Sequence, residues 1–163
     1  MKELNKELKI YELSLIWKEA EYNFAFWDKV NKNLNWDIEY KKSLNTVLKT
    51  NNIFEYYLEL KRFIALLKDG HTDVSFPEEV YNSPRYNSSL PISMAYIDGE
   101  YYVVAIKECV KGVVKEYSKI LKINDVDIHE YIETNILPYI WHEKLDSCAD
   151  NLFNLLHMGK EGS

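Results

Sequence analysis

The feature that most constrains this chain is a change in hydrophobic period at residue 70. Before it, apolar side chains recur at steps of four, three, four and three, the spacing of one face of an α-helix. This stripe consists of Ile53, Tyr57, Leu60, Ile64 and Leu67. After it, residues 71–76 alternate and include β-branched side chains, which predicts a strand. We expect Gly70 to be the left-handed residue that ends the helix.

The residues before this helix also show helical spacing. Residues 4–17 carry an apolar stripe at steps of four, three and four, and residues 36–48 carry a second one. Asp37 is placed to be the N-cap or first-turn acid of the second helix, and Asn51-Asn52 should cap the helix that follows. We expect the tryptophans at these helical spacings to belong to a core rather than to a ligand cleft.

The second half of the chain has the shorter period of strands. Residues 90–96 alternate strictly, Asp98-Gly99 is a strong two-residue hairpin signal, and residues 101–106 form the return strand. A shorter strand at residues 120–123 ends at Asn124-Asp125. A helix is expected from residue 129 to residue 137, because Pro138 would stop it.

These patterns predict an α+β chain with an N-terminal helical bundle region followed by a small α/β domain. Residues 1–76 form the helical region, which ends in an Asp-Gly-His-Thr segment, and residues 77–89 form a polar linker or loop. Residues 90–159 form the α/β domain, with a last helix at residues 145–156. Residues 160–163 are expected to be a tail or a vector remnant.

Charge and hydropathy exclude several classes of function. The net charge is -6, and the only arginines are Arg62 and Arg85, so the chain lacks the clustered basic face of a nucleic-acid binder. No run of 18 apolar residues could span a membrane. The N-terminus has no apolar signal-peptide core, so the chain is either cytoplasmic or exported with its signal removed, and the sequence leaves the compartment open.

No complete set of catalytic or metal-binding motifs is present. The chain contains no nucleophile-elbow, P-loop or HExxH pattern, and it has only five glycines. None of the four histidines (His71, His129, His142 and His157) stands at metal-ligand spacing from another histidine or a cysteine, so we expect neither metal nor cofactor. The two cysteines, Cys109 and Cys148, should be free thiols packed as small apolar groups.

His71 is the candidate catalytic residue on local grounds. It follows Asp69-Gly70 at the predicted junction of a helix and a strand, where two rigid elements would aim its side chain. A histidine near its ordinary pKa can act as a general base at neutral pH. Asp69, Thr72 or Asp73 could orient the ring. The alternative is a histidine that only caps or packs at the turn.

Two segments carry a resemblance to a known family. Residues 15–28, which contain Trp-Lys-Glu-Ala, and residues 66–72, which contain Asp-Gly-His-Thr, resemble the N-terminal region of C-terminal processing (tail-specific, tricorn-like) serine peptidases. In that family this region precedes a PDZ-like domain. Residues 90–106, 120–128 and 136–140 resemble that domain, so the resemblance covers essentially the whole chain.

The resemblance implies that the chain is the N-terminal part of a serine endopeptidase. The nucleophilic serine would lie in a catalytic core that follows the PDZ-like domain and is absent from these residues. In tricorn-like members the histidine that matches His71 is the general base, whereas other members use a Ser–Lys dyad within the core. The implied partners are a peptide or protein substrate and the missing core, and an oligomer is possible.

The resemblance to a PDZ-like domain is incomplete. Asp125 occupies the usual glycine of the Ile-Asn-Gly turn, and Tyr117-Ser118 stands where a glycine is usual. No glycine loop that would bind a C-terminal carboxylate is evident. Two other functions therefore stay open, a non-catalytic PDZ-like module that binds peptides by strand addition and a helical scaffold for oligomer assembly.

Overall fold

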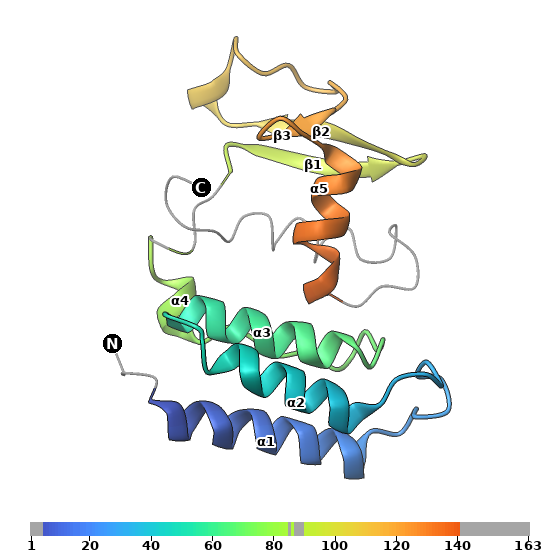
Figure 1. Cartoon of the computed structure of the whole chain (residues 1–163). Coiled ribbons are helices and arrows are strands. Elements are labelled where there is room, and N and C mark those ends of the chain that lie inside the picture. Colours follow the sequence, from blue (N-terminus) through green and yellow to red (C-terminus); the bar gives the residue numbers. More distant parts are fainter. Residues whose placement is uncertain (1–4, 85, 87–89, 141–163) are drawn as a thin grey trace. The chain divides into compact units, whose positions relative to one another are not determined.

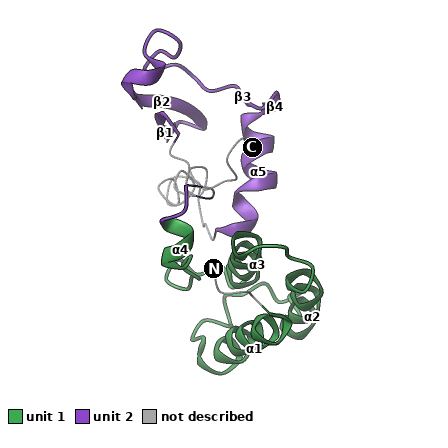
Figure 2. Cartoon of the chain, turned by 90° about the vertical axis from the view of Figure 1, so that its left-hand side faces the viewer, with its two compact units in different colours: residues 1–81 green, residues 82–163 purple. Residues whose placement is uncertain are grey.

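The computed structural model describes residues 5–84, 86 and 90–140, and it is an α+β structure with a helical N-terminal region followed by strands. It separates into two compact units, residues 1–81 and 82–163 (Figures 1 and 2). The division falls inside the stretch that the sequence predicts as a linker. The predicted last helix at residues 145–156 lies outside the described residues.

The first unit is built on three helices, α1 (Lys6–Asn23), α2 (Trp36–Val47) and α3 (Ile53–Ala65). The helix α2 packs against both of the others, and a short helix, α4 (Glu78–Tyr81), is the last element of the unit. Each long helix begins at an asparagine whose side-chain oxygen accepts a backbone hydrogen bond at 2.8–3.0 Å. These caps are Asn5, Asn35 and Asn52, so Asp37 is a first-turn acid rather than the N-cap.

Aromatic side chains fill much of the core of the first unit. Trp36 stacks on Phe63 with ring centroids 4.1 Å apart, and Trp27 meets Trp36 edge-on. The indole nitrogens of Trp36 and Trp27 donate to the carbonyls of Trp17 and Ala20, so their polar atoms are satisfied inside the core. The expectation that the tryptophans are core residues is confirmed for Trp36, and Trp17 and Trp27 are partly buried against the same core.

The predicted strand at residues 71–76 is wrong. The segment is extended, and its side chains alternate between exposed and partly or fully buried, but no strand pairs with it in the described part of the chain. It lies along α3, where the Lys61 ammonium donates to the carbonyl of Val74 (3.0 Å) and to both Asp73 oxygens (2.6 and 2.7 Å). Alternating apolar and polar residues indicate that one face of an extended segment is buried. In residues 71–76 that face is covered by a helix rather than by a neighbouring strand.

The second unit contains a hairpin of β1 (Ile92–Ile97) and β2 (Glu100–Ile106), as predicted. Asp98 and Gly99 both have positive φ (51° and 87°), which is the backbone of a type I′ turn. Beyond β2, the chain passes through a 3-10 turn, η1 (Glu108–Val110). Residues 117–120 then run beside β2, where Ile120 N donates to the Tyr101 carbonyl at 2.7 Å.

The predicted strand at residues 120–123 is correct only in its second half. The strand β3 (Lys122–Ile123) pairs with β4 (Val126–Asp127) across Asn124-Asp125, both of which have positive φ. The helix α5 (Ile128–Asn135) follows, capped by Asp127, and a 3-10 turn, η2 (Leu137–Tyr139), contains Pro138. Cys109 is exposed, contrary to the expectation of a packed thiol, and Cys148 lies outside the described residues.

The left-handed residue after α3 is Lys68 (φ 54°) rather than Gly70. A side chain with a Cβ is strained in this conformation and glycine is not. We therefore expect Lys68→Gly to raise the free energy of unfolding by about 0.5–1 kcal/mol in urea titrations. The matched control is Lys49→Gly, in the turn after α2, where φ is not positive and glycine should lower stability by a similar amount. Equal changes in the free energy of unfolding for the two substitutions would contradict the left-handed conformation of Lys68.

Tyr56 is fully buried, and its hydroxyl donates to the Glu12 carboxylate at 2.9 Å. Burial, and then this hydrogen bond, raise the pKa of Tyr56 well above its ordinary 10.0. The unfolded chain therefore loses this proton at a lower pH than the folded chain does, so stability should fall as the pH rises above about 10. Denaturant titrations between pH 8 and pH 11 should show a shallower fall for Tyr56→Phe, whereas the exposed Tyr11→Phe should follow the wild type.

Candidate active site

The turn that carries His71 begins where α3 ends. Leu66 is the C-cap, and the amides of Leu67 and Lys68 donate to Ile64 and Ala65 at 3.0 and 3.1 Å. The side chain of Leu67 is buried in the core, which anchors the start of the turn. The left-handed backbone of Lys68 then redirects the chain out of the helix.

The carboxylate of Asp69 is held by the residue that follows His71. The Thr72 hydroxyl donates to Asp69 Oδ2, and the Thr72 amide donates to the Asp69 carbonyl at 3.3 Å. The Asp69 side chain is largely buried. Thr72 therefore positions the Asp69 carboxylate.

His71 projects into solvent, with its side chain 99% exposed. Its Nδ1 atom lies 3.9 Å from Asp69 Oδ1, which is close enough for attraction but too far for a hydrogen bond. Asp73 does not orient the ring, because Lys61 occupies both of its carboxylate oxygens. Of the three residues that sequence reasoning offered as orienting groups, Asp69 is the one beside the ring.

No nucleophile completes the site within the described part of the chain. The described serines include Ser75, Ser93 and Ser118, and none of them is hydrogen-bonded to His71. The described residues also contain no group of three or more histidine, cysteine or acidic side chains placed to hold a metal ion.

None of the described helices has the length and apolar character needed to cross a membrane.

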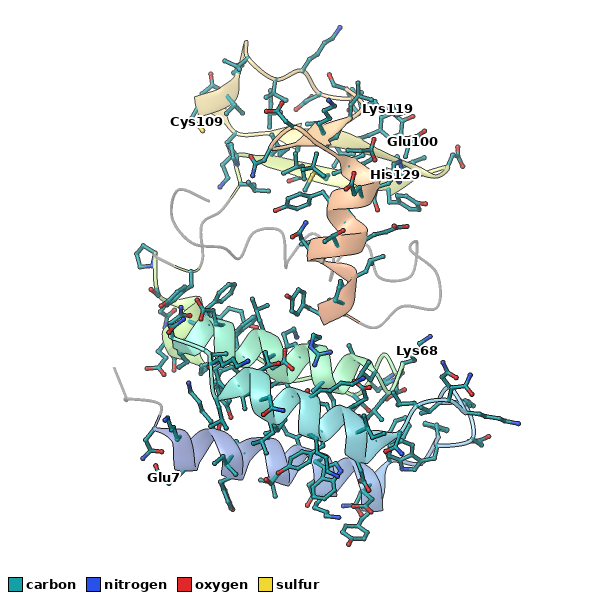
Figure 3. All side chains as sticks on the ribbon, viewed as in Figure 1. Glu7, Lys68, Glu100, Cys109, Lys119 and His129 are labelled. Carbon is teal, nitrogen blue, oxygen red and sulfur yellow. The ribbon has the colours of Figure 1, made fainter. Side chains whose placement is uncertain are left out.

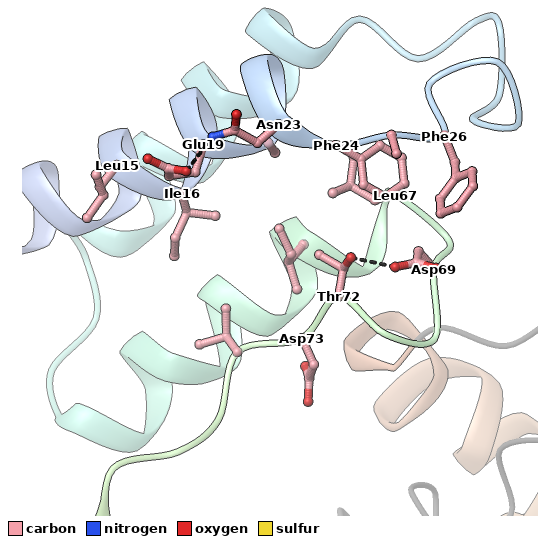
Figure 4. Close-up of a pocket in the computed structure, with 14 residues that line it drawn as sticks. Leu15, Ile16, Glu19, Asn23, Phe24, Phe26, Leu67, Asp69, Thr72 and Asp73 are labelled. Atoms are coloured by element: carbon pink, nitrogen blue, oxygen red, sulfur yellow. Dashed lines mark hydrogen bonds between the residues drawn. The ribbon is translucent and has the colours of Figure 1, made fainter.

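A pocket of about 470 Å³ lies beside this turn, and sequence reasoning missed it (Figure 4). Its walls come from the second half of α1, the loop after it, the end of α3 and the extended segment. The pocket is lined by Leu15, Ile16, Glu19, Ala20, Asn23, Phe24, Ala25, Phe26, Ile64, Leu67, Asp69, Thr72, Asp73 and Val74. Asp69 and Thr72 thus belong both to the His71 turn and to the pocket.

The second unit has a separate charged cluster that sequence reasoning also missed (Figure 3). Glu100 accepts from Lys119 at 2.8 Å and lies 3.4 Å from Nε2 of His129. The hydrogen bond with Lys119 lowers the pKa of Glu100, and the same bond raises the pKa of Lys119. The cluster links β2, the 117–120 segment and α5. All three side chains are partly exposed and no nucleophile is part of the cluster, so we interpret it as a structural contact rather than a catalytic site.

A scan against protein-family models finds no match to this chain, and a search of curated proteins finds none either. The resemblance to C-terminal processing peptidases therefore remains a hypothesis based on the sequence motifs.

The exposure of His71 can be measured directly. Diethyl pyrocarbonate modifies accessible neutral imidazoles, so we expect His71 to react faster than His129, whose ring contacts Tyr101 and Glu100. Peptide mapping by mass spectrometry at several reaction times gives a separate rate for each histidine. A slower rate at His71 than at His129 would show that the ring is covered in solution.

Proposed function

We propose that this chain is the N-terminal part of a serine endopeptidase of the C-terminal processing family, and that His71 is its general base. The observation that carries the proposal is the turn itself. The sequence segment that resembles the family, Asp-Gly-His-Thr, forms a turn in which Thr72 fixes the Asp69 carboxylate and Asp69 lies beside Nδ1 of His71. An acid near one ring nitrogen and an open second ring nitrogen support the role of a general base.

The chemistry follows from the two ring nitrogens. Asp69 would accept a hydrogen bond from Nδ1–H, which leaves Nε2 as the proton acceptor. Nε2 would take the proton from a serine hydroxyl as its oxygen attacks the peptide carbonyl, and would later give that proton to the leaving amine. A distance of 3.9 Å is compatible with this role, because catalytic hydrogen bonds commonly shorten only when the substrate complex forms.

The proposal requires a serine and an oxyanion hole outside these 163 residues. The open side of His71 supports it, because a nearly fully exposed imidazole is available to a nucleophile supplied by another part of a longer protein. The chain alone is then expected to have no peptidase activity. The Asp69–Thr72 pair would act as a positioning device, since Thr72 holds the Asp69 carboxylate and that carboxylate lies 3.9 Å from Nδ1 of His71.

In the longer protein, His71→Ala should lower kcat on a casein-type substrate by about 10²–10⁴-fold. Asp69→Asn should also lower kcat, because the amide cannot stabilise the protonated ring. The matched control is His129→Ala, which removes a partly exposed imidazole of the other unit and should leave kcat within about threefold. A kcat within about threefold of wild type for His71→Ala would show that the base assignment is wrong.

A second candidate is a peptide-binding module without catalysis. The observation that favours it is the hairpin of the second unit, where β1 pairs only with β2 among the described strands, so that its other edge has no partner strand there. An extended peptide could add to such an edge. This candidate gains support if the longer protein has no peptidase activity while isothermal titration shows that the second unit binds extended peptides.

A further inference from the structure

The helix α1 has apolar side chains on two faces. One face carries Leu13 and Ala20, which are buried in the core of the first unit. The other carries Tyr11, Leu15 and Tyr22, which are 65%, 47% and 74% exposed. Spacings of four and seven residues place these three on one side of the helix. A helix that presents large apolar groups to solvent on the side away from its core has the character of a binding surface.

Leu15 joins this exposed face to the pocket beside the His71 turn. Figure 4 shows Leu15, Ile16 and Glu19 on α1 and Asp69 and Thr72 on the turn, with Phe24, Phe26 and Leu67 at one end of the view. Most of the lining is apolar, and a volume of about 470 Å³ lies within the range of roughly 300–1,000 Å³ typical of ligand pockets. We name the pocket, together with Leu15 at its mouth, the α1 groove; on the exposed face beside it, Lys18 lies over the Tyr22 ring and pairs with Glu21.

Charge identifies the occupant of the α1 groove. Two acidic residues of the α1 groove are Glu19, which forms no ion pair within the described part of the chain, and Asp69, whose neighbour is the exposed His71 ring at 3.9 Å. Their carboxylates accept from Asn23 and Thr72, which are neutral donors, so both negative charges remain. The third acid, Asp73, is neutralised by Lys61. No lysine or arginine lines the pocket.

We propose that the α1 groove binds a peptide segment in which apolar side chains alternate with, or lie next to, lysine or arginine. The apolar groups would enter the pocket, and the cationic groups would lie near Glu19 and Asp69. A second copy of this chain fits less well, because an isologous contact would bring the same two carboxylates of each copy into one interface. The inference goes beyond the proposed function and does not depend on it, since binding needs no catalytic step.

The first test is equilibrium binding to the 163-residue chain, measured by fluorescence anisotropy. The probe is a short fluorescein-labelled peptide in which leucine alternates with lysine. Two further peptides carry glutamate in place of lysine or serine in place of leucine. We expect the leucine–lysine peptide to bind at least about tenfold more tightly than either of the others. Equal affinity for the lysine and glutamate peptides would overturn the proposal.

The second test locates the site. Leu15→Lys places a cation in the groove at a position that is already 47% exposed, and should weaken binding of the leucine–lysine peptide at least about tenfold. The matched control is Ile38→Lys on α2, which is 49% exposed, does not line the pocket and should leave binding within about twofold. Phe26→Lys, at the end of the pocket, should repeat the effect of Leu15→Lys if the latter variant is unstable in thermal melts.

Either of two results would overturn the proposal at this stage. One is unchanged binding in both groove variants. The other is a wild-type dimer in sedimentation velocity that Leu15→Lys converts to a monomer, which would make a second copy of the chain the occupant.

Discussion

The buried ammonium of Lys61 is the interaction on which the rest of the first unit's candidate site depends. A lysine on the core-facing side of α3 requires acceptors, and it finds them in the Asp73 carboxylate and the Val74 carbonyl. These bonds hold the extended segment against the helix without a partner strand. The Lys61 contacts with Asp73 and Val74 hold one wall of the pocket and the end of the His71 turn in place. The site is therefore built from a helix and an extended segment rather than from a sheet.

The parts of the fold that could be predicted from sequence are those set by local rules. The stripe of α3 and the Asp98-Gly99 hairpin follow directly from spacing and turn chemistry, and both are present. The extended segment after Gly70 was misread because alternation does not reveal whether a sheet or a helix provides the covering surface. The left-handed position fell on Lys68 because the helix ends earlier than its apolar stripe, at Ala65.

The candidate site could be predicted only in part, because it depends on contacts that sequence spacing does not determine. A sequence motif identifies His71, and the chemistry of Asp69 and Thr72 makes them natural neighbours, but the direction of their hydrogen bond could not be inferred from spacing. The pocket depends on residues up to 59 positions apart, from Leu15 to Val74, which no local pattern relates. One sequence signal was available, namely that α1 is apolar on more of its circumference than a single buried face requires.

The helix caps of the two units differ in the charge of the side chain that accepts the first hydrogen bond. The long helices α1, α2 and α3 all start at asparagine, whose amide oxygen accepts its hydrogen bond whatever the proton concentration. The helix α5 in the second unit starts instead at Asp127, whose acceptor is a carboxylate. The caps of the first unit are therefore neutral acceptors, whereas the cap of α5 is an acidic side chain at the positive end of the helix dipole, where a negative charge is favoured.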